Sequence, residues 1–210
     1  MTFAKLERDA ACDALLAVAP DSPTLCEGWS AHDLAAHLWV REHDPLALPG
    51  VVVPPLQRLT AERMERVKRR WPYQRLAEEV RQGPPPFSPF SLPGADERAN
   101  TLEYFVHAED VRRAAGLPPR DTDPAFEDYV WPRLKRAARL MLRGSRDGIV
   151  LERATENGVV GETVHAAPGS QVVTVIGRPS ELLLFAFGRR TAADVHYVGE
   201  PGAVTRVRRG

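Results

Sequence analysis

The spacing of the apolar residues changes near Gly144, and this change limits the chain to a two-part fold. Before Gly144, apolar residues recur every three or four positions, which is typical of amphipathic helices. After it, short β-branched runs such as residues 172–176 (VVTVI) are separated by Gly, Asn and Ser, which is typical of strands. The sequence therefore predicts a mainly α protein, with a helical domain over residues 1–145 and a small α/β domain over 146–210.

Capping residues, glycines and prolines mark the expected elements. Ser30 and Asp33 have the spacing of a capping box, so a helix is expected to begin at Ser30 or Ala31 and to end before Pro45. Another helix is expected from about Asp96 to a Gly-Leu-Pro-Pro stop at 116–119. Further helices are expected over 2–18, 56–70, 72–80, 123–144 and 179–187, strands near 149–151, 159–160, 172–176 and 195–198, and proline-rich loops over 45–55 and 84–93.

Charge and composition exclude several classes of function. Lys and Arg number 28 and Asp and Glu also number 28, so no overall field favours a nucleic acid or an anionic membrane surface. The N-terminus lacks the apolar run of a signal peptide, and nothing approaches the ~18 apolar residues of a membrane span, which leaves the cytoplasm as the expected location. Cys12 and Cys26 match neither zinc-ribbon nor redox spacing, and we expect reduced, mostly buried thiols.

Three residues suggest a metal site. Glu103 and His107 are four positions apart in an expected helix, so both side chains lie on one face, about one turn apart. Carboxylate oxygen and imidazole nitrogen suit borderline divalent metals, although such a pair is also a common surface pair. His37 lies on an apolar stripe between Leu34 and Leu38, where a buried imidazole needs polar partners. Taken alone, His37 has two possible roles. It is either a metal ligand or a core histidine that is hydrogen-bonded to a backbone carbonyl.

Two segments resemble a known family. Residues 25–38 (LCEGWSAHDLAAHL) resemble the GW-x-x-x-DL-x-x-HL signature of the DinB-like proteins related to mycothiol-dependent maleylpyruvate isomerase, and residues 103–110 (EYFVHAED) resemble that family's E-x3-H-x2-D run. Residues 181–189 (ELLLFAFGR) are similar to the small domain that follows the helical bundle in this family. Within the family, the chain resembles an uncharacterised actinobacterial branch described only as metal-binding.

The resemblance implies a four-helix bundle with a metal site between facing helices. The family's two histidines and one glutamate correspond to His37, His107 and Glu103 in this sequence. Three protein ligands leave a position open for water or substrate. Zinc is the expected ion because it is redox-inert and matches the family, although iron or nickel also suit these ligands.

Two further residues have candidate roles around this site. Asp110, three residues after His107, is expected to fix the tautomer of a ligand imidazole, and an ion pair with Arg112 or Arg113 is its alternative role. Arg189 is the candidate for the second-domain arginine that binds an anionic group in the isomerase. The other histidines, His32, His43, His165 and His196, have no partner at metal-ligand spacing and are expected to be incidental.

The function expected from these features is metal-dependent chemistry on a small thiol. A divalent ion with an open position lowers the pKa of a bound thiol or polarises a carbonyl. The first hypothesis is a transferase or isomerase that uses mycothiol or another small thiol together with an electrophilic substrate. The alternatives are a metal-binding or stress-associated protein without turnover, and a scaffold with vestigial ligands. No oligomeric state is predicted.

Overall fold

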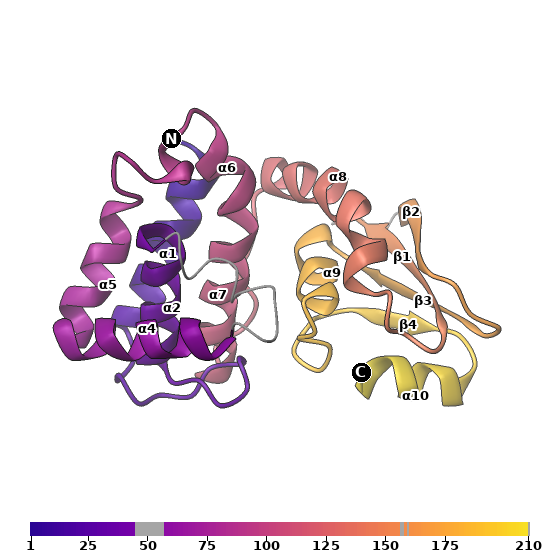
Figure 1. Cartoon of the computed structure of the whole chain (residues 1–210). Helices are drawn as coiled ribbons and strands as arrows, with labels where there is room; N and C mark the ends of the chain where they lie inside the picture. The colour runs from indigo at the N-terminus through magenta and orange to yellow at the C-terminus, as the bar shows by residue number, and fades with distance from the viewer. Residues whose placement is uncertain (45–56, 156–157, 159, 210) are drawn as a thin grey trace. The chain divides into compact units, whose positions relative to one another are not determined.

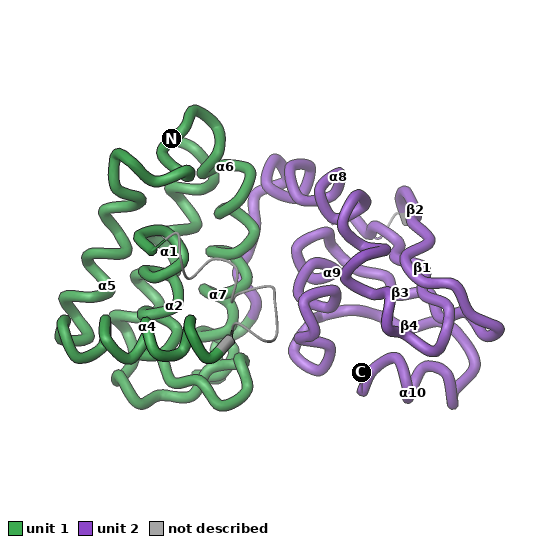
Figure 2. Tube along the Cα trace, in the orientation of Figure 1, with its two compact units in different colours: residues 1–118 green, residues 119–210 purple. Residues whose placement is uncertain are grey.

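The computed structural model describes residues 1–44, 57–155, 158 and 160–209 and divides into two compact units, residues 1–118 and 119–210 (Figure 2). The sequence placed this division near residue 145. The difference arises because helix α8 (Pro124–Met141) packs on α9 (Pro179–Ala186) and on β2 (Val160–Ala167), and therefore belongs with the second unit. The proline-rich loop expected over 45–55 lies outside the described residues.

Unit 1 is helical (Figure 1). Helix α1 (Phe3–Leu16) packs along α7 (Thr101–Ala114), and α5 (Tyr73–Gln82) packs against both α1 and α2 (Ala31–His43). Helix α4 (Gln57–Arg70) packs on α2. Two short elements, η2 (Pro89–Ser91) and α6 (Ala95–Ala99), precede α7. The unit is thus mainly α, as expected, and its assignment as a DinB-like four-helix bundle stays a prediction.

Buried apolar side chains hold unit 1 together. Leu15, Leu34, Leu38 and Leu76 are essentially inaccessible to solvent. Burying each of these side chains stabilises the fold by about 1.5–3 kcal/mol relative to leaving it exposed. Because Leu34 and Leu38 are one turn apart on α2, they fix the rotation of this helix about its axis and with it the direction of the residue between them, His37.

The capping box expected at the start of α2 is present. Ser30 Oγ accepts a hydrogen bond from the backbone amide of Asp33, and the Asp33 carboxylate accepts one from the backbone amide of Ser30 at 2.9 Å. These two bonds satisfy amides that have no partner inside the helix. Helix α2 therefore begins where the sequence predicted, and the register of its residues follows from that start.

The single helix expected from Asp96 to Gly116 is wrong, because the chain breaks at Asn100 into α6 and α7. Asn100 is fully buried, and its side-chain amide donates to Glu42 Oε1 and to Asp96 Oδ1, each at 2.7 Å. The backbone N–H of Asn100 still donates to the carbonyl of Asp96, at 2.8 Å. The interruption lets Asn100 reach polar partners inside unit 1 and starts α7 at Thr101.

Unit 2 contains a four-stranded sheet in the order β2-β1-β3-β4. Strands β1 (Gly148–Ala154) and β3 (Val172–Gly177) are parallel neighbours, whereas β2 and β4 (His196–Val198) pair antiparallel at the two edges. Helix α9 packs on β1 and β3, and α10 (Pro201–Arg209), which the sequence analysis did not predict, packs on β3. The mixed sheet with its helices agrees with the expected small α/β domain.

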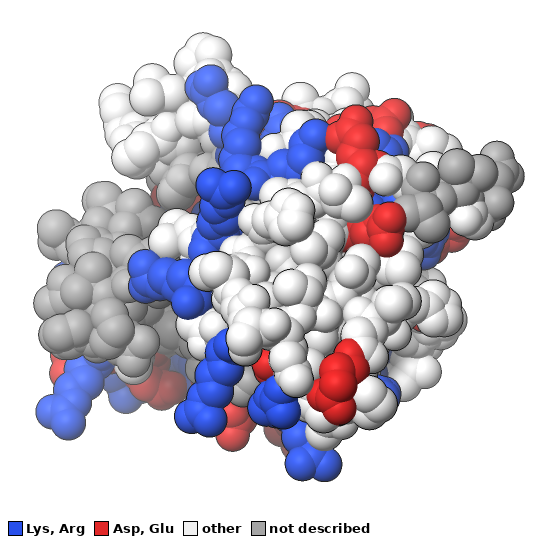
Figure 3. Space-filling view, turned by 90° about the vertical axis from the view of Figure 1, so that its right-hand side faces the viewer, with Lys and Arg blue, Asp and Glu red and all other residues white. Residues whose placement is uncertain are grey.

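Charge is unevenly distributed on the surface although the whole chain is neutral. On the face drawn in Figure 3, Lys and Arg side chains form a band that runs from top to bottom, and most of the acidic side chains lie outside it. Within the described residues, no helix combines the length and the apolar character needed to cross a membrane.

Candidate metal centre

Helices α2 and α7 bring the three candidate ligands together in unit 1. His37 comes from α2, and Glu103 and His107 lie one turn apart on α7. Each of the three offers a ligand atom, and these atoms all lie within 4.8 Å of one another. His107 Nε2 is 3.5 Å from Glu103 Oε2, and the His37 and His107 rings are 5.3 Å apart between centroids. These three residues thus form a group that could hold a metal ion, and their assignment as ligands stays a prediction.

His37 is a buried imidazole without a hydrogen bond to any described residue. Its exposed fraction is 7%, and among the described residues it contacts the rings of Trp29 and His107 but makes no hydrogen bond. Burial lowers the pKa of His37 to about 3, and the neighbouring His107 charge adds to this effect. The imidazole is therefore neutral at pH 7, which is the form that ligates metals. A buried imidazole without a hydrogen bond is costly, and an ion between the three ligands would remove that cost.

Asp110 orients His107. The Nδ1–H of His107 donates to Asp110 Oδ2 at 2.9 Å, and Asp110 is fully buried. This bond leaves Nε2 as the ring atom directed toward Glu103. Arg113, one of the alternative partners expected for Asp110, donates to Glu109 at 2.7 Å. The contact between Asp110 and His107 is the one that the orienting role needs, and that role stays a prediction.

The His107 imidazole is surrounded by acceptors. Burial opposes its charged form, but contacts with Asp110, Cys26 and Glu103 outweigh burial and raise the pKa of His107 well above its ordinary value. These contacts thus favour the protonated form of His107, whose ring lies between two carboxylates. An incoming divalent ion would have to displace this proton, because only neutral imidazole ligates.

Glu103 is ionised and divided between two partners. Burial alone would raise the pKa of Glu103, but its hydrogen bond with His107 and the charge of Arg41 lower it to about 2. Oε2 faces His107, whereas Oε1 is 3.9 Å from Nη2 of Arg41. The carboxylate therefore carries its negative charge over the whole physiological range and can neutralise part of the charge of a cation.

Arg41 is itself held by the helix break. Its guanidinium donates to the side-chain oxygen of Asn100 and to the carbonyl of Ala99, the latter at 2.9 Å. Arg41 lies one turn after His37 on α2, so the same helix supplies a ligand and a cation that contacts the next ligand.

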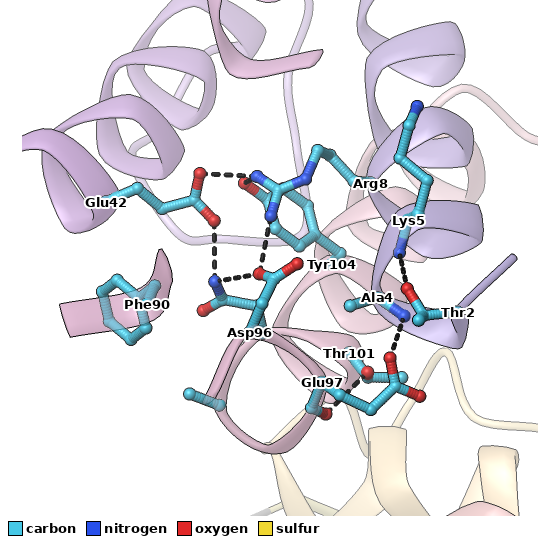
Figure 4. A network of polar contacts seen from close by, with 12 residues as sticks. Thr2, Ala4, Lys5, Arg8, Glu42, Phe90, Asp96, Glu97, Thr101 and Tyr104 are labelled. Atoms are coloured by element: carbon cyan, nitrogen blue, oxygen red, sulfur yellow. Dashed lines mark hydrogen bonds and ion pairs between the residues drawn. The ribbon is translucent and has the colours of Figure 1, made fainter. Parts of the chain in front are cut away.

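Arg8, Glu42, Asp96 and Tyr104 form a buried ionic network next to this helix break (Figure 4). The guanidinium of Arg8 donates to Glu42 at 2.5 Å, to the hydroxyl of Tyr104 at 2.7 Å and to Asp96 at 2.6 Å. Arg8 and Glu42 are almost completely buried, at 1% and 2% exposed. With Asn100 bonded to both Glu42 and Asp96, these contacts join α1, α2, α6 and α7. The network fixes the ends of the helices that carry the candidate ligands.

Sequence reasoning missed Cys26 and Arg41. The Cys26 thiol donates to Asp110 Oδ2 at 3.1 Å and lies 3.9 Å from His107 Nδ1, so Cys26, His107 and Asp110 form a second group of possible metal ligands. Both cysteines are free thiols as expected, but Cys26 is only half-buried. The spacing of four between His37 and Arg41 could have revealed the arginine. For Cys26 the only signal was its place in the segment that precedes α2.

The remaining predicted residues lie outside the cluster. Among the described residues, the two groups of three close ligand atoms contain none of the other histidines, which are His32, His43, His165 and His196. Arg189 follows α9 in unit 2, where its guanidinium donates to the carbonyl of Phe187 at 2.7 Å. Its expected role in binding an anionic group stays a prediction.

Comparisons with known proteins identify the fold. No protein-family model and no curated protein sequence matches the chain. Two solved structures do match: mycothiol-dependent maleylpyruvate isomerase, with a TM-score of 0.52, and a histidine-to-alanine mutant of that enzyme, with a TM-score of 0.50. Each is 18% identical and covers 94% of this chain and 91% of its own length. At this level of identity, the similarity shows that the chain shares the isomerase fold over nearly its whole length.

Proposed function

We propose that the protein binds a divalent metal ion through His37, Glu103 and His107 and uses it to activate a small thiol. The observation that carries the proposal is the convergence of three ligand atoms within 4.8 Å, one of them on a buried imidazole that makes no hydrogen bond to a described residue. Two neutral nitrogens and one carboxylate form a donor set that borderline divalent metals prefer. The shared fold supports the thiol as the substrate class, because the similar enzyme is mycothiol-dependent.

Residues around the proposed metal site have different roles in preparing its ligands. Burial keeps His37 neutral, and Asp110 holds His107 in the tautomer that leaves Nε2 available. Arg41 contacts one oxygen of Glu103 and leaves the other facing His107. A bound divalent ion would supply the Lewis acid that favours the thiolate over the thiol. We propose zinc, a cytoplasmic location and a transferase or isomerase reaction with an electrophilic co-substrate.

Metal content tests the site itself. The wild-type protein, His37→Ala, His107→Ala and the control His196→Ala, which changes an exposed histidine in unit 2, are purified identically, loaded with zinc and measured by elemental analysis. The wild type and the control are expected to hold one equivalent, and the two ligand variants much less. Equal zinc in all four proteins would refute the ligand assignment.

Thiol binding tests the activity class. Cobalt replaces zinc with little change in geometry and reports a bound thiolate by a sulfur-to-metal charge-transfer band. The cobalt-loaded protein is titrated with mycothiol, bacillithiol or glutathione in the Cys26→Ser background, so that the half-buried Cys26 does not contribute to the band. A new band that saturates with thiol is expected, followed by conjugation or isomerisation when electrophiles are added.

The second candidate function is metal binding without turnover. The observation that favours it is the second ligand group, because Cys26, His107 and Asp110 could also close around an ion. Structural zinc sites are closed by four protein ligands, whereas catalytic sites keep a position open. Cobalt loading that gives a thiolate band before any thiol is added, and loses it in Cys26→Ser, would support this alternative over the enzyme.

A further inference from the structure

Unit 2 contains a cavity in which half of the lining residues are arginines, whereas the candidate metal ligands all belong to unit 1. The cavity has a volume of about 390 Å³. Its walls come from the turn between α8 and β1, from Arg190 after α9 and from the last turn of α10. The charged residues that line it are Arg146, Asp147, Arg190, Arg206 and Arg209. The lining thus carries an excess of three positive charges.

The single acidic residue in the lining, Asp147, is already paired with one of the arginines. Asp147 accepts two hydrogen bonds from Arg206, from Nε at 2.8 Å and from Nη2 at 2.9 Å. Arg206 also donates to the side-chain oxygen of Gln171 at 2.9 Å. This two-point pairing fixes the Arg206 guanidinium at the wall of the cavity and leaves Asp147 unable to neutralise the other arginines.

Arg190 is a half-buried cation without a carboxylate. Its guanidinium donates to the carbonyl of Val207 at 2.7 Å and lies 5.3 Å from the centroid of the Phe185 ring, and among the described residues no acidic side chain pairs with it. Burial lowers the pKa of Arg190. The positive charge is therefore held in place at a cost that a neighbouring anion would offset.

A purely structural role explains only part of this arrangement. Val207 lies in the last turn of α10, where backbone carbonyls have no helical partner, so the bond from Arg190 caps that helix end. One such bond occupies one of five guanidinium donors. It does not explain why Arg146 and Arg209, which have no acidic partner among the described residues, line the same cavity.

We propose that this cavity binds a small, multiply charged oxyanion, with Arg190 as its central contact. Guanidinium groups recognise phosphate and carboxylate oxygens by paired hydrogen bonds, and two of the guanidiniums here are fixed before any ligand arrives. The volume is within the range of small-molecule sites. The proposal does not rest on the proposed metal chemistry.

Isothermal titration of the full-length protein at low ionic strength tests the proposal, with pyrophosphate and citrate as separate probes for phosphate and carboxylate ligands. One equivalent is expected to bind to the wild type. Arg190→Gln is expected to weaken binding about tenfold or more, the loss typical of a charge-assisted hydrogen bond. The control Arg136→Gln removes the same charge from an exposed position on α8 outside the cavity and is expected to bind as the wild type does.

Two outcomes would overturn the proposal. One is the absence of binding of either probe to the wild type at millimolar concentration, and the other is an equal effect of Arg190→Gln and Arg136→Gln. If circular dichroism shows that Arg190→Gln does not fold, the double variant Arg146→Gln/Arg209→Gln decides instead, because both residues are exposed. Wild-type affinity in that double variant would equally overturn the site.

Discussion

The sequence predicted that His37 is buried, but it did not reveal which groups surround the imidazole. The apolar stripe of α2 predicted its burial, and the structure adds that the ring packs against Trp29 and His107 without a hydrogen bond to a described residue. Cys26 shows the opposite case, because its contact with Asp110 joins residues 84 positions apart. A contact of that range depends on how α7 packs near the segment before α2, and no local pattern encodes it.

The low pKa of His37 predicts an acid-sensitive stability in the metal-free protein. Burial lowers the pKa of His37 to about 3. Between pH 6.5 and about 3, this imidazole is therefore protonated in the unfolded chain but neutral in the folded chain. The free energy of unfolding should therefore fall as the pH drops through this window. In His37→Leu, urea unfolding in the presence of a chelator should show a smaller fall between pH 7 and pH 4. If the free energy of unfolding of this variant fell with pH as steeply as that of the wild type, the burial of a neutral imidazole would be contradicted. The control is His165→Leu, which changes an exposed histidine.

Asp110 is expected to set the metal affinity through His107. Removing a partner that orients a ligand imidazole typically costs 10–100-fold in metal affinity. Asp110→Asn should therefore weaken zinc binding by about this factor in a competition with a chromophoric chelator, whereas Cys26→Ser, which keeps a donor for Asp110, should change it little. Equal affinities of Asp110→Asn and wild type would remove the orienting role.

At the scale of the elements, the strongest local signals predicted best. The capping box gave the start of α2, and the glycine and proline signals gave the ends of α7 and α9 within a few residues. The break at Asn100 was missed because it is caused by buried partners from another helix, Glu42 above all. Helix α10 was missed because only Ala203 and Val207 are buried in it, which is too weak a periodic pattern.

The buried ionic network around Arg8 should contribute strongly to the stability of unit 1. Removing one partner of a buried ion pair leaves an uncompensated charge and costs about 3–5 kcal/mol. Arg8→Met is expected to lower the free energy of unfolding by about this amount in urea titrations, and Arg8→Met/Glu42→Leu should recover part of the loss. A single variant that loses less than about 1 kcal/mol, or a double variant less stable than the single one, would show that the network is not tightly coupled.

At the scale of the whole molecule, the sequence predicted a helical part followed by a small α/β part, and the structure has both. It placed the boundary too late because the periodicity of α8 resembles that of the preceding helices, whereas the partners of α8 are α9 and β2. Periodicity reports the type of an element and not its neighbours. The similarity to mycothiol-dependent maleylpyruvate isomerase extends across 94% of the chain and therefore includes both parts.

The central claim is that one divalent ion joins α2 to α7. Anomalous scattering from crystals of the zinc-loaded protein, recorded on both sides of the zinc absorption edge, tests it most directly. One strong peak is expected about 2.0–2.2 Å from a nitrogen of His37, a nitrogen of His107 and an oxygen of Glu103. A peak bound instead by Cys26 and Asp110, or no peak among these residues, would contradict it.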